Sequence, residues 1–194
     1  ALSLRTKDGI INLMGGTMKA SSEENGKNNV YSVWLADTFA GTLNITDGEM
    51  HSDLGAAVCG SPSDCVVNIS GGKILSDNDY GLKCAKNGTV NLSGNISIKG
   101  GKNGIYIPDG KLVNITGAIT GADVSVYAEA SGILTSGLGK HISDSTLKRY
   151  LPYIKANGKI SVNDDGELII DIPVATSTTS VLGSATSTTT TISL

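Results

Sequence analysis

Apolar and polar residues alternate in five short segments of the chain, and the five segments share one pattern. In each, an asparagine stands between two apolar residues and a glycine follows within four positions; the segments are residues 10–18, 42–50, 66–74, 89–96 and 112–119. An apolar residue at every second position is typical of a β-strand with one buried face. Its recurrence predicts a repeat architecture, in which each unit buries its apolar face against its neighbours.

The spacing of the segments indicates which kind of repeat this is. The shared asparagines lie 32, 24, 23 and 23 residues apart along the sequence. Each unit also holds a second β-rich run, and these runs are residues 30–35, 56–59, 82–84, 105–107 and 124–127. Glycines that follow the first strand, such as Gly71 and Gly72, are expected to end it at a corner. Two or three short strands in about 23 residues predict one coil of a parallel β-helix, because a β-propeller blade needs about 40 residues.

The alternation also predicts which side chains point inward and which point outward. We expect the apolar neighbours of the asparagines to face the core; they are Leu43, Ile45, Val67, Ile69, Val90, Leu92, Val113 and Ile115. The outer face then carries a ladder of amides at Asn44, Asn68, Asn91 and Asn114, with hydroxyls beside it at Thr46, Ser70, Ser93 and Thr116. Such a face can bind a glycan or ordered, ice-like water. The alternative that we favour is that the amides hydrogen-bond to one another along the stack.

The single tryptophan, Trp34, is the other candidate for contact with a ligand. An aromatic ring on a strand next to a loop can stack on a sugar. Because Trp34 stands between Val33 and Leu35 and close to Phe39 in the sequence, we expect it instead in the core or against an end cap.

Composition fits a narrow solenoid core and excludes two classes of partner. The chain has 25 glycines, 4% aromatic and 17% charged residues, and a net charge of −3. The lysines are scattered, so the basic stripe of a nucleic-acid-binding protein is missing. No apolar run is long enough to span a bilayer. Because the sequence begins inside what resembles repeat sequence, we expect it to be part of a longer chain.

Three cysteines leave the disulfide pattern open. Cys59 and Cys65 flank a short loop that a disulfide can close, while Cys59 and Cys84 occupy similar places in successive units. Three buried thiols are the other alternative. With only two histidines in the chain, we do not expect a zinc site.

Carboxylates are the residues that would point to an enzyme. Asp77 and Asp79 lie close enough in sequence to help bind calcium, which prefers oxygen ligands, and Asp53 is their one acidic neighbour in the adjacent unit. Their clustering with a metal in one groove would favour a polysaccharide-cleaving enzyme. A turn rich in Asp and Asn explains the run better, so we expect no catalytic residues and no required cofactor.

The repeat fades after residue 131. Residues 143–151 have N-cap residues and helical spacing, which predicts a short helix that ends near Pro152. Two β-rich runs around residues 163–166 predict a hairpin. We expect these elements to cap the solenoid, so that residues 1–175 form one unit. Residues 176–194 are rich in Thr and Ser and form either a tail or linker, or an added strand.

Four stretches of the chain resemble the right-handed β-helix modules of large, repetitive bacterial surface proteins, especially those of gut Firmicutes. The stretches are residues 67–72, 113–117, 131–139 and 163–168. The resemblance implies a right-handed, all-β parallel β-helix at the cell surface or outside the cell. It also implies a non-catalytic module that adheres to a host or environmental glycan or to a surface protein.

Overall fold

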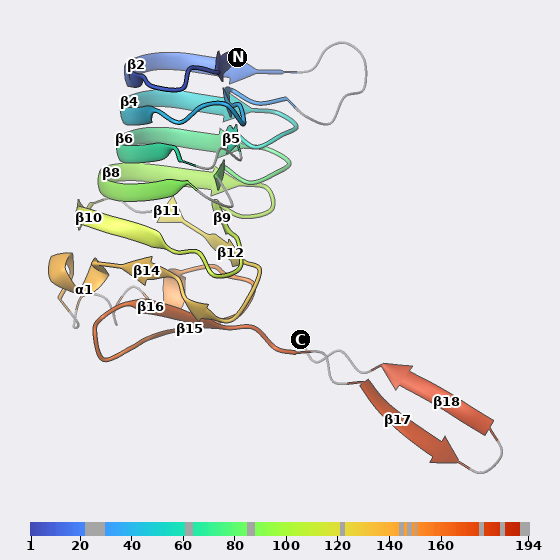
Figure 1. Cartoon of the computed structure of the whole chain (residues 1–194). Helices are drawn as coiled ribbons and strands as arrows, with labels where there is room; N and C mark the ends of the chain where they lie inside the picture. The colour runs from blue at the N-terminus through green and yellow to red at the C-terminus, as the bar shows by residue number, and fades with distance from the viewer. Residues whose placement is uncertain are drawn as a thin grey trace.

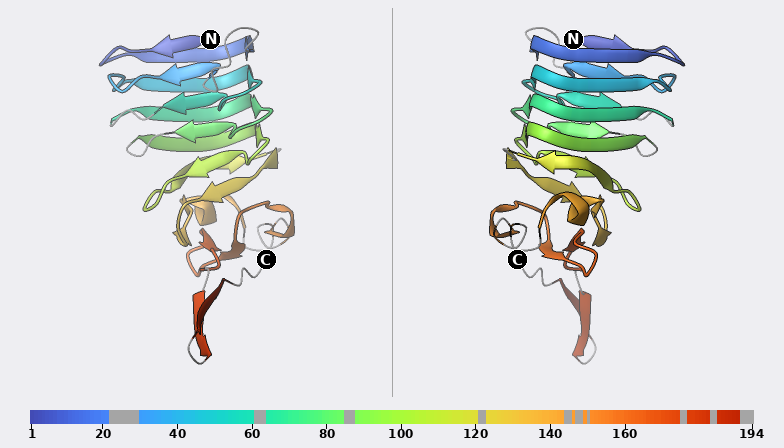
Figure 2. Two further views of the ribbon diagram at one scale, coloured as in Figure 1. Left: turned by 90° about the vertical axis from the view of Figure 1, so that its right-hand side faces the viewer. Right: turned by 90° about the vertical axis from the view of Figure 1, so that its left-hand side faces the viewer.

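The fold is the predicted parallel β-helix, with a small antiparallel cap at its C-terminal end (Figure 1). The computed structural model describes residues 1–21, 30–60, 64–84, 88–120, 123–143, 146, 149, 151–174, 177–182 and 185–190. The coils stack in chain order, so that the first and last coils lie at opposite ends of the solenoid (Figures 1 and 2).

One face of the solenoid is a parallel sheet of long strands. Its order is β14-β10-β8-β6-β4-β2, and β11 pairs with β8 beside this path. The strands are β2 (Ile10–Ala20), β4 (Thr42–Ser52), β6 (Val66–Ser76), β8 (Thr89–Gly100), β10 (Val113–Ile119), β11 (Asp123–Val124) and β14 (Thr135–Ser136). The register places Asn44 opposite Asn68 and Asn68 opposite Asn91. Residues at equivalent positions of the sequence repeat are therefore paired in the sheet.

The opposite face is a parallel sheet of short strands in the order β1-β3-β5-β7-β9-β12. These strands are β1 (Leu2–Leu4), β3 (Val33–Leu35), β5 (Val58–Gly60), β7 (Leu82–Cys84), β9 (Ile105–Ile107) and β12 (Val126–Ala128). In β3, β9 and β12 the two outer residues are buried and the middle one is partly exposed. These three strands therefore present their middle residues on the outside of the solenoid.

Between the two sheets lies one continuous apolar core, as the alternation predicts. All eight residues that were expected to face inward are buried, from Leu43, Ile45 and Val67 with no exposed surface to Val90 at 9%. Phe39 is also fully buried. The core is built mainly from β-branched and leucine side chains, which pack well between stacked strands.

The glycines do not end the long strands, and this part of the prediction is wrong. Each long strand continues through its glycine and bends there, with φ of 96° at Gly48, 88° at Gly72 and 70° at Gly94. A Cβ atom on Gly72 would stand 2.8 Å from the carbonyl oxygen of Gly48, and one on Gly94 would stand 2.0 Å from that of Ser70. Glycine is required at these bends because the backbones of successive coils pass so close together.

The C-terminal cap is an antiparallel sheet in the order β13-β16-β15, and its hairpin was predicted. Its strands are β13 (Gly132–Ile133), β15 (Lys159–Val162) and β16 (Leu168–Asp171), accompanied by α1 (Leu138–His141) and the 3-10 helix η1 (Leu151–Tyr153). The Glu167 carboxylate accepts hydrogen bonds from Thr135 Oγ1 at 2.8 Å, Gly137 N at 2.7 Å and Leu138 N at 3.1 Å. Glu167 thus ties the hairpin to the end of the solenoid.

The predicted helix at residues 143–151 lies partly outside the described residues. Within the described part of this segment, Thr146 and Arg149 are helical. The Thr/Ser-rich tail forms a hairpin of its own, in which β17 (Ser177–Leu182) pairs antiparallel with β18 (Ala185–Thr190). The tail therefore forms strands, and these strands pair with each other as a separate two-stranded sheet.

Candidate functional site

The asparagine ladder forms a continuous chain of hydrogen bonds along the stack. Each side-chain amide donates to the amide oxygen of the preceding coil. The four bonds are Asn44 to Asn12 at 2.8 Å, Asn68 to Asn44 at 2.7 Å, Asn91 to Asn68 at 2.7 Å and Asn114 to Asn91 at 3.0 Å. This is the favoured alternative of the sequence analysis, in which the ladder stabilises the stack.

Two of the four hydroxyls beside the ladder donate hydrogen bonds to the preceding coil. Thr46 Oγ1 donates to the Leu13 carbonyl at 3.4 Å, and Thr116 Oγ1 donates to the Leu92 carbonyl at 3.5 Å. Ser70 is exposed and Ser93 is half-buried. Recognition of a glycan or of ice-like water by this face stays a prediction, because its polar groups serve the fold in the first place.

Trp34 lies on the outside of the solenoid, so the expectation of a core or end-cap position is wrong. Its neighbours Val33 and Leu35 are fully buried, and because side chains alternate along β3, Trp34 must face outward. The half-buried indole stacks on Tyr31, with ring centroids 4.8 Å apart and an interplanar angle of 21°. Burial raises the pKa of the Tyr31 hydroxyl above its ordinary value.

A second group of aromatic rings lies further along the same sheet. Tyr106 in β9 stacks on Tyr127 in β12, with ring centroids 5.9 Å apart. The centroid of the Tyr80 ring lies 5.1 Å from that of Tyr106 and 5.7 Å from that of Tyr127. The Tyr106 hydroxyl donates a hydrogen bond to the Glu129 carboxylate. Burial, followed by this bond, raises the Tyr106 pKa well above its ordinary value. The Lys83 ammonium lies over the Tyr80 and Tyr106 rings at 5.8 Å and 5.4 Å.

The two groups belong to one surface, which we call the aromatic face. It consists of Tyr31, Trp34, Tyr80, Tyr106 and Tyr127, five of the eight aromatic residues in the chain. Parallel pairing places Trp34 opposite Cys59, Cys59 opposite Lys83, and Tyr106 opposite Tyr127. These side chains form a row that runs along the solenoid axis, and among its aromatic residues only Trp34 was singled out from the sequence.

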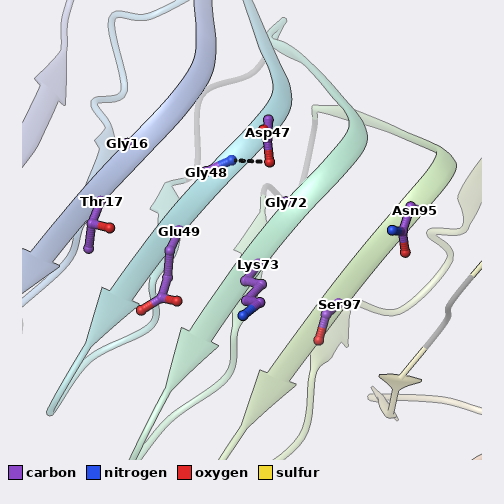
Figure 3. A pocket seen from close by; sticks show the side chains of 9 residues that line it. All are labelled: Gly16, Thr17, Asp47, Gly48, Glu49, Gly72, Lys73, Asn95 and Ser97. Carbon is purple, nitrogen blue, oxygen red and sulfur yellow. Dashed lines mark hydrogen bonds between the residues drawn. The ribbon is translucent and has the colours of Figure 1, made fainter.

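A polar groove crosses the long-strand sheet at its glycine bends (Figure 3). It has a volume of about 430 Å³ and is lined by Gly16, Thr17, Asp47, Gly48, Glu49, Gly72, Lys73, Asn95 and Ser97. Register places Thr17 opposite Glu49, Glu49 opposite Lys73, and Lys73 opposite Ser97. Asp47 accepts a hydrogen bond from Gly48 N at 2.7 Å. The groove holds none of the residues predicted to bind a ligand or a metal.

The predicted calcium ligands Asp77 and Asp79 do not form a common site. Asp77 Oδ1 lies 2.9 Å from His51 Nε2, whereas Asp79 Oδ1 lies 2.8 Å from Lys102 Nζ. The Asp79 carboxylate raises the pKa of Lys102. Asp53 does lie near Asp77, as expected, but the residue that joins them is His51, which the sequence analysis did not consider beside the two carboxylates.

Cys59 and Cys65 are free, buried thiols, so neither of the two disulfides considered from the sequence, Cys59–Cys65 and Cys59–Cys84, is formed. The register explains the second case, because Cys84 lies opposite Gly60 and Cys59 lies opposite Lys83. Burial raises the pKa of each thiol to about 11, and in Cys59 the nearby Lys83 acts in the opposite direction.

Among the described residues, no helix has the length and apolar character needed to cross a membrane. Comparison with known proteins gives no match, whether to a family model, a curated protein or a solved structure. The resemblance to bacterial surface modules therefore stays a prediction, and function has to be argued from the surfaces of the molecule.

Proposed function

We propose that this chain is a non-catalytic, glycan-binding module of an extracellular or cell-surface protein, and that it binds through the aromatic face. The observation that carries the proposal is the placement of four half-buried aromatic rings on the outside of one sheet, with the buried Tyr80 ring in contact with two of them. Aromatic rings that combine an apolar surface with a polar tip are suited to stack on the apolar faces of sugars.

The composition of the aromatic face favours a glycan over a protein partner. Docking sites for proteins combine aromatic side chains with a desolvated apolar centre. On the described residues, the large apolar side chains that are exposed lie elsewhere, at Ile10, Met14, Leu112, Ile133 and Val174. The aromatic face instead combines rings with Lys83, Lys102 and the carboxylates of Asp79 and Glu129. Rings bordered by polar groups fit a hydrated ligand.

The spacing of the rings favours an extended chain of several sugars. Trp34 and Tyr106 are separated by the strands that carry Cys59 and Lys83, which makes three strand steps or about 14 Å. Each step is close to the length of one sugar ring in an extended chain. Cys59 is 8% exposed and leaves a low point between the two groups of rings. We therefore expect tetrasaccharides to bind more tightly than disaccharides, because only the longer chain contacts both groups.

The first experiment is a glycan-array screen of the purified chain, followed by fluorescence titration with the glycans that bind. Trp34 is the only tryptophan, so its emission reports occupancy of the aromatic face directly. Trp34→Ala and Tyr127→Ala are each expected to weaken binding at least tenfold, which corresponds to about 1.4 kcal/mol for each lost stacking contact. Because Trp34→Ala lacks the fluorescent residue, its binding is measured by calorimetry.

The matched control is Asn91→Ala, which removes a side chain of similar exposure from the asparagine ladder on the opposite sheet. It is expected to leave glycan affinity unchanged. Binding that is lost in Asn91→Ala but kept in Trp34→Ala would refute the assignment to the aromatic face. Circular dichroism spectra of all variants establish that the fold is retained.

A second candidate function is cleavage of a polysaccharide in the polar groove. The observation that favours it is the presence of Asp47, Glu49 and Lys73 in one open groove (Figure 3). Two carboxylates that flank a bound sugar are the groups a glycosidase uses. New reducing or unsaturated ends, formed by the chain and abolished in Glu49→Gln, would establish this function in place of the first.

A further inference from the structure

Three potential metal ligands meet at the corner where β4 and β6 end. His51 Nε2 lies 2.9 Å from Asp77 Oδ1 and 3.8 Å from Asp53 Oδ1. The three ligand atoms all lie within 4.8 Å of one another. His51 and Asp53 belong to one coil and Asp77 belongs to the next, so the group exists only when the coils stack.

The backbone holds these three residues in place without help from a ligand. His51 is part of β4, where it lies opposite Lys19 in β2 and Leu75 in β6. Asp53 N donates to the Ala20 carbonyl and Asp77 N donates to the Ser52 carbonyl, each at 3.0 Å. A site whose ligands stand on a paired strand or directly after one is preorganised, so little conformational entropy is lost when an ion binds.

One oxygen of this corner lacks a hydrogen bond. Asp53 Oδ1 has almost no contact with solvent and accepts no hydrogen bond in the described structure, although the Lys19 ammonium lies 3.3 Å away. The Lys19 ammonium and the His51 ring, which can become positively charged, lie near it, and the Asp77 carboxylate lies within 4.8 Å. A buried carboxylate oxygen without a hydrogen bond is a position at which a cation is expected.

The ligand types select the class of cation. Calcium and magnesium prefer shells made of oxygen alone, whereas zinc takes imidazole nitrogen together with carboxylate oxygen. Bonds of 2.0 to 2.1 Å in tetrahedral geometry separate ligand atoms by about 3.3 Å. The distances of 2.9 Å and 3.8 Å from His51 Nε2 lie on either side of that value, so small rotations of the side chains suffice.

We propose that His51, Asp53 and Asp77 form a binding site for a divalent transition metal of the zinc type, with water in the fourth position. Lys19 occupies part of the site in competition with the ion. Its side chain is 55% exposed and can turn to solvent when the ion enters. None of these residues belongs to the aromatic face, so metal binding can be tested independently of glycan binding.

The experiment is titration of the purified, chelator-treated chain with Zn²⁺ by calorimetry, repeated with Co²⁺ and visible absorption. Tetrahedral cobalt gives an intense visible band, which reports the geometry. His51→Ala and Asp77→Asn are each expected to weaken binding at least tenfold. Lys19→Met is expected to strengthen it several-fold, because the competing ammonium is gone. This gain cannot come from a variant that merely unfolds.

Two controls separate this site from other groups that bind zinc. Asp79→Asn removes a carboxylate from the same turn that pairs with Lys102, and it is expected to leave affinity unchanged. His141→Ala does the same for the only other histidine. Wild-type binding weaker than about 1 mM, or affinity that survives in His51→Ala, would overturn the proposal.

Discussion

Removal of a single amide from the asparagine ladder tests whether the ladder stabilises the stack. Asn68 stands in the interior of the ladder, where it donates to Asn44 and accepts from Asn91, each at 2.7 Å. Asn114 stands at one end, where it donates to Asn91 at 3.0 Å. Replacement of Asn68 by alanine therefore breaks two side-chain hydrogen bonds, and replacement of Asn114 breaks one.

The expected loss follows from the number of bonds. A typical hydrogen bond contributes about 0.5–1.5 kcal/mol net to stability. Both asparagines are half-buried, so water can satisfy part of what is left unpaired and the lower half of that range applies. Asn68→Ala is expected to lower the free energy of unfolding by about 1–2 kcal/mol, and Asn114→Ala by about half as much.

Urea denaturation, followed by Trp34 fluorescence and by circular dichroism, measures both losses. The two probes should give one transition, which justifies the use of a single free energy. Equal losses in the two variants, or no loss in Asn68→Ala, would refute the reasoning. Thermal denaturation of the double variant provides a further test, because two sites in one network are not expected to be additive.

Three further variants test the bends, a buried thiol and the cap. Gly72→Ala is expected to lower the free energy of unfolding by about 3 kcal/mol or more, because φ is 88° and the new Cβ would stand 2.8 Å from a carbonyl oxygen. Its control is Gly110→Ala, where φ is 68° and the space is open, and which should lower that free energy by only about 1–2 kcal/mol. Urea denaturation measures both. Burial raises the Cys59 pKa from 9.0 to about 11, so its stabilising effect is full below pH 9 and is lost as pH rises toward 11. Between pH 8 and 10.5, under reducing conditions, wild type should therefore lose about 1–2 kcal/mol more than Cys59→Ala, and parallel curves would contradict this. Glu167→Ala breaks three hydrogen bonds at the cap and is expected to cost about 2–4 kcal/mol, whereas an unchanged melting temperature would show that the cap is held by its apolar contacts.

The coils could be predicted because two independent signals agree. Period-2 alternation places Leu43 and Ile45 inside, and the spacing of the asparagines places successive coils in register. The bends could not be predicted correctly, because a glycine at the end of a strand and a glycine at a bend within a strand look the same in sequence. Only the close passage of the Gly48 carbonyl shows why Gly72 lies at a bend within a continuous strand.

The sequence did contain the signal that places Trp34 outside, but a general preference for burial was given more weight. The alternation that was used for the long strands applies equally to Val33-Trp34-Leu35, where two buried neighbours force the middle residue outward. The same rule assigns Lys83, Tyr106 and Tyr127 to the outer row. In a solenoid this narrow, local alternation decides burial more strongly than residue type.

The proposed metal site of His51, Asp53 and Asp77 shows a different limit of sequence reasoning. Asp53 and Asp77 are separated by 24 residues, the same interval that separates Asn44 from Asn68, so their proximity follows from the repeat. His51 lies on the strand before the corner, and its distance to Asp77 depends on how far each strand extends past its glycine bend. A zinc site was not expected because the chain has only two histidines, and His51 was not placed beside Asp77 because the strands were expected to end at those glycines. Functional groups on the outside of a solenoid therefore depend on where its corners fall, which the core-facing pattern does not determine.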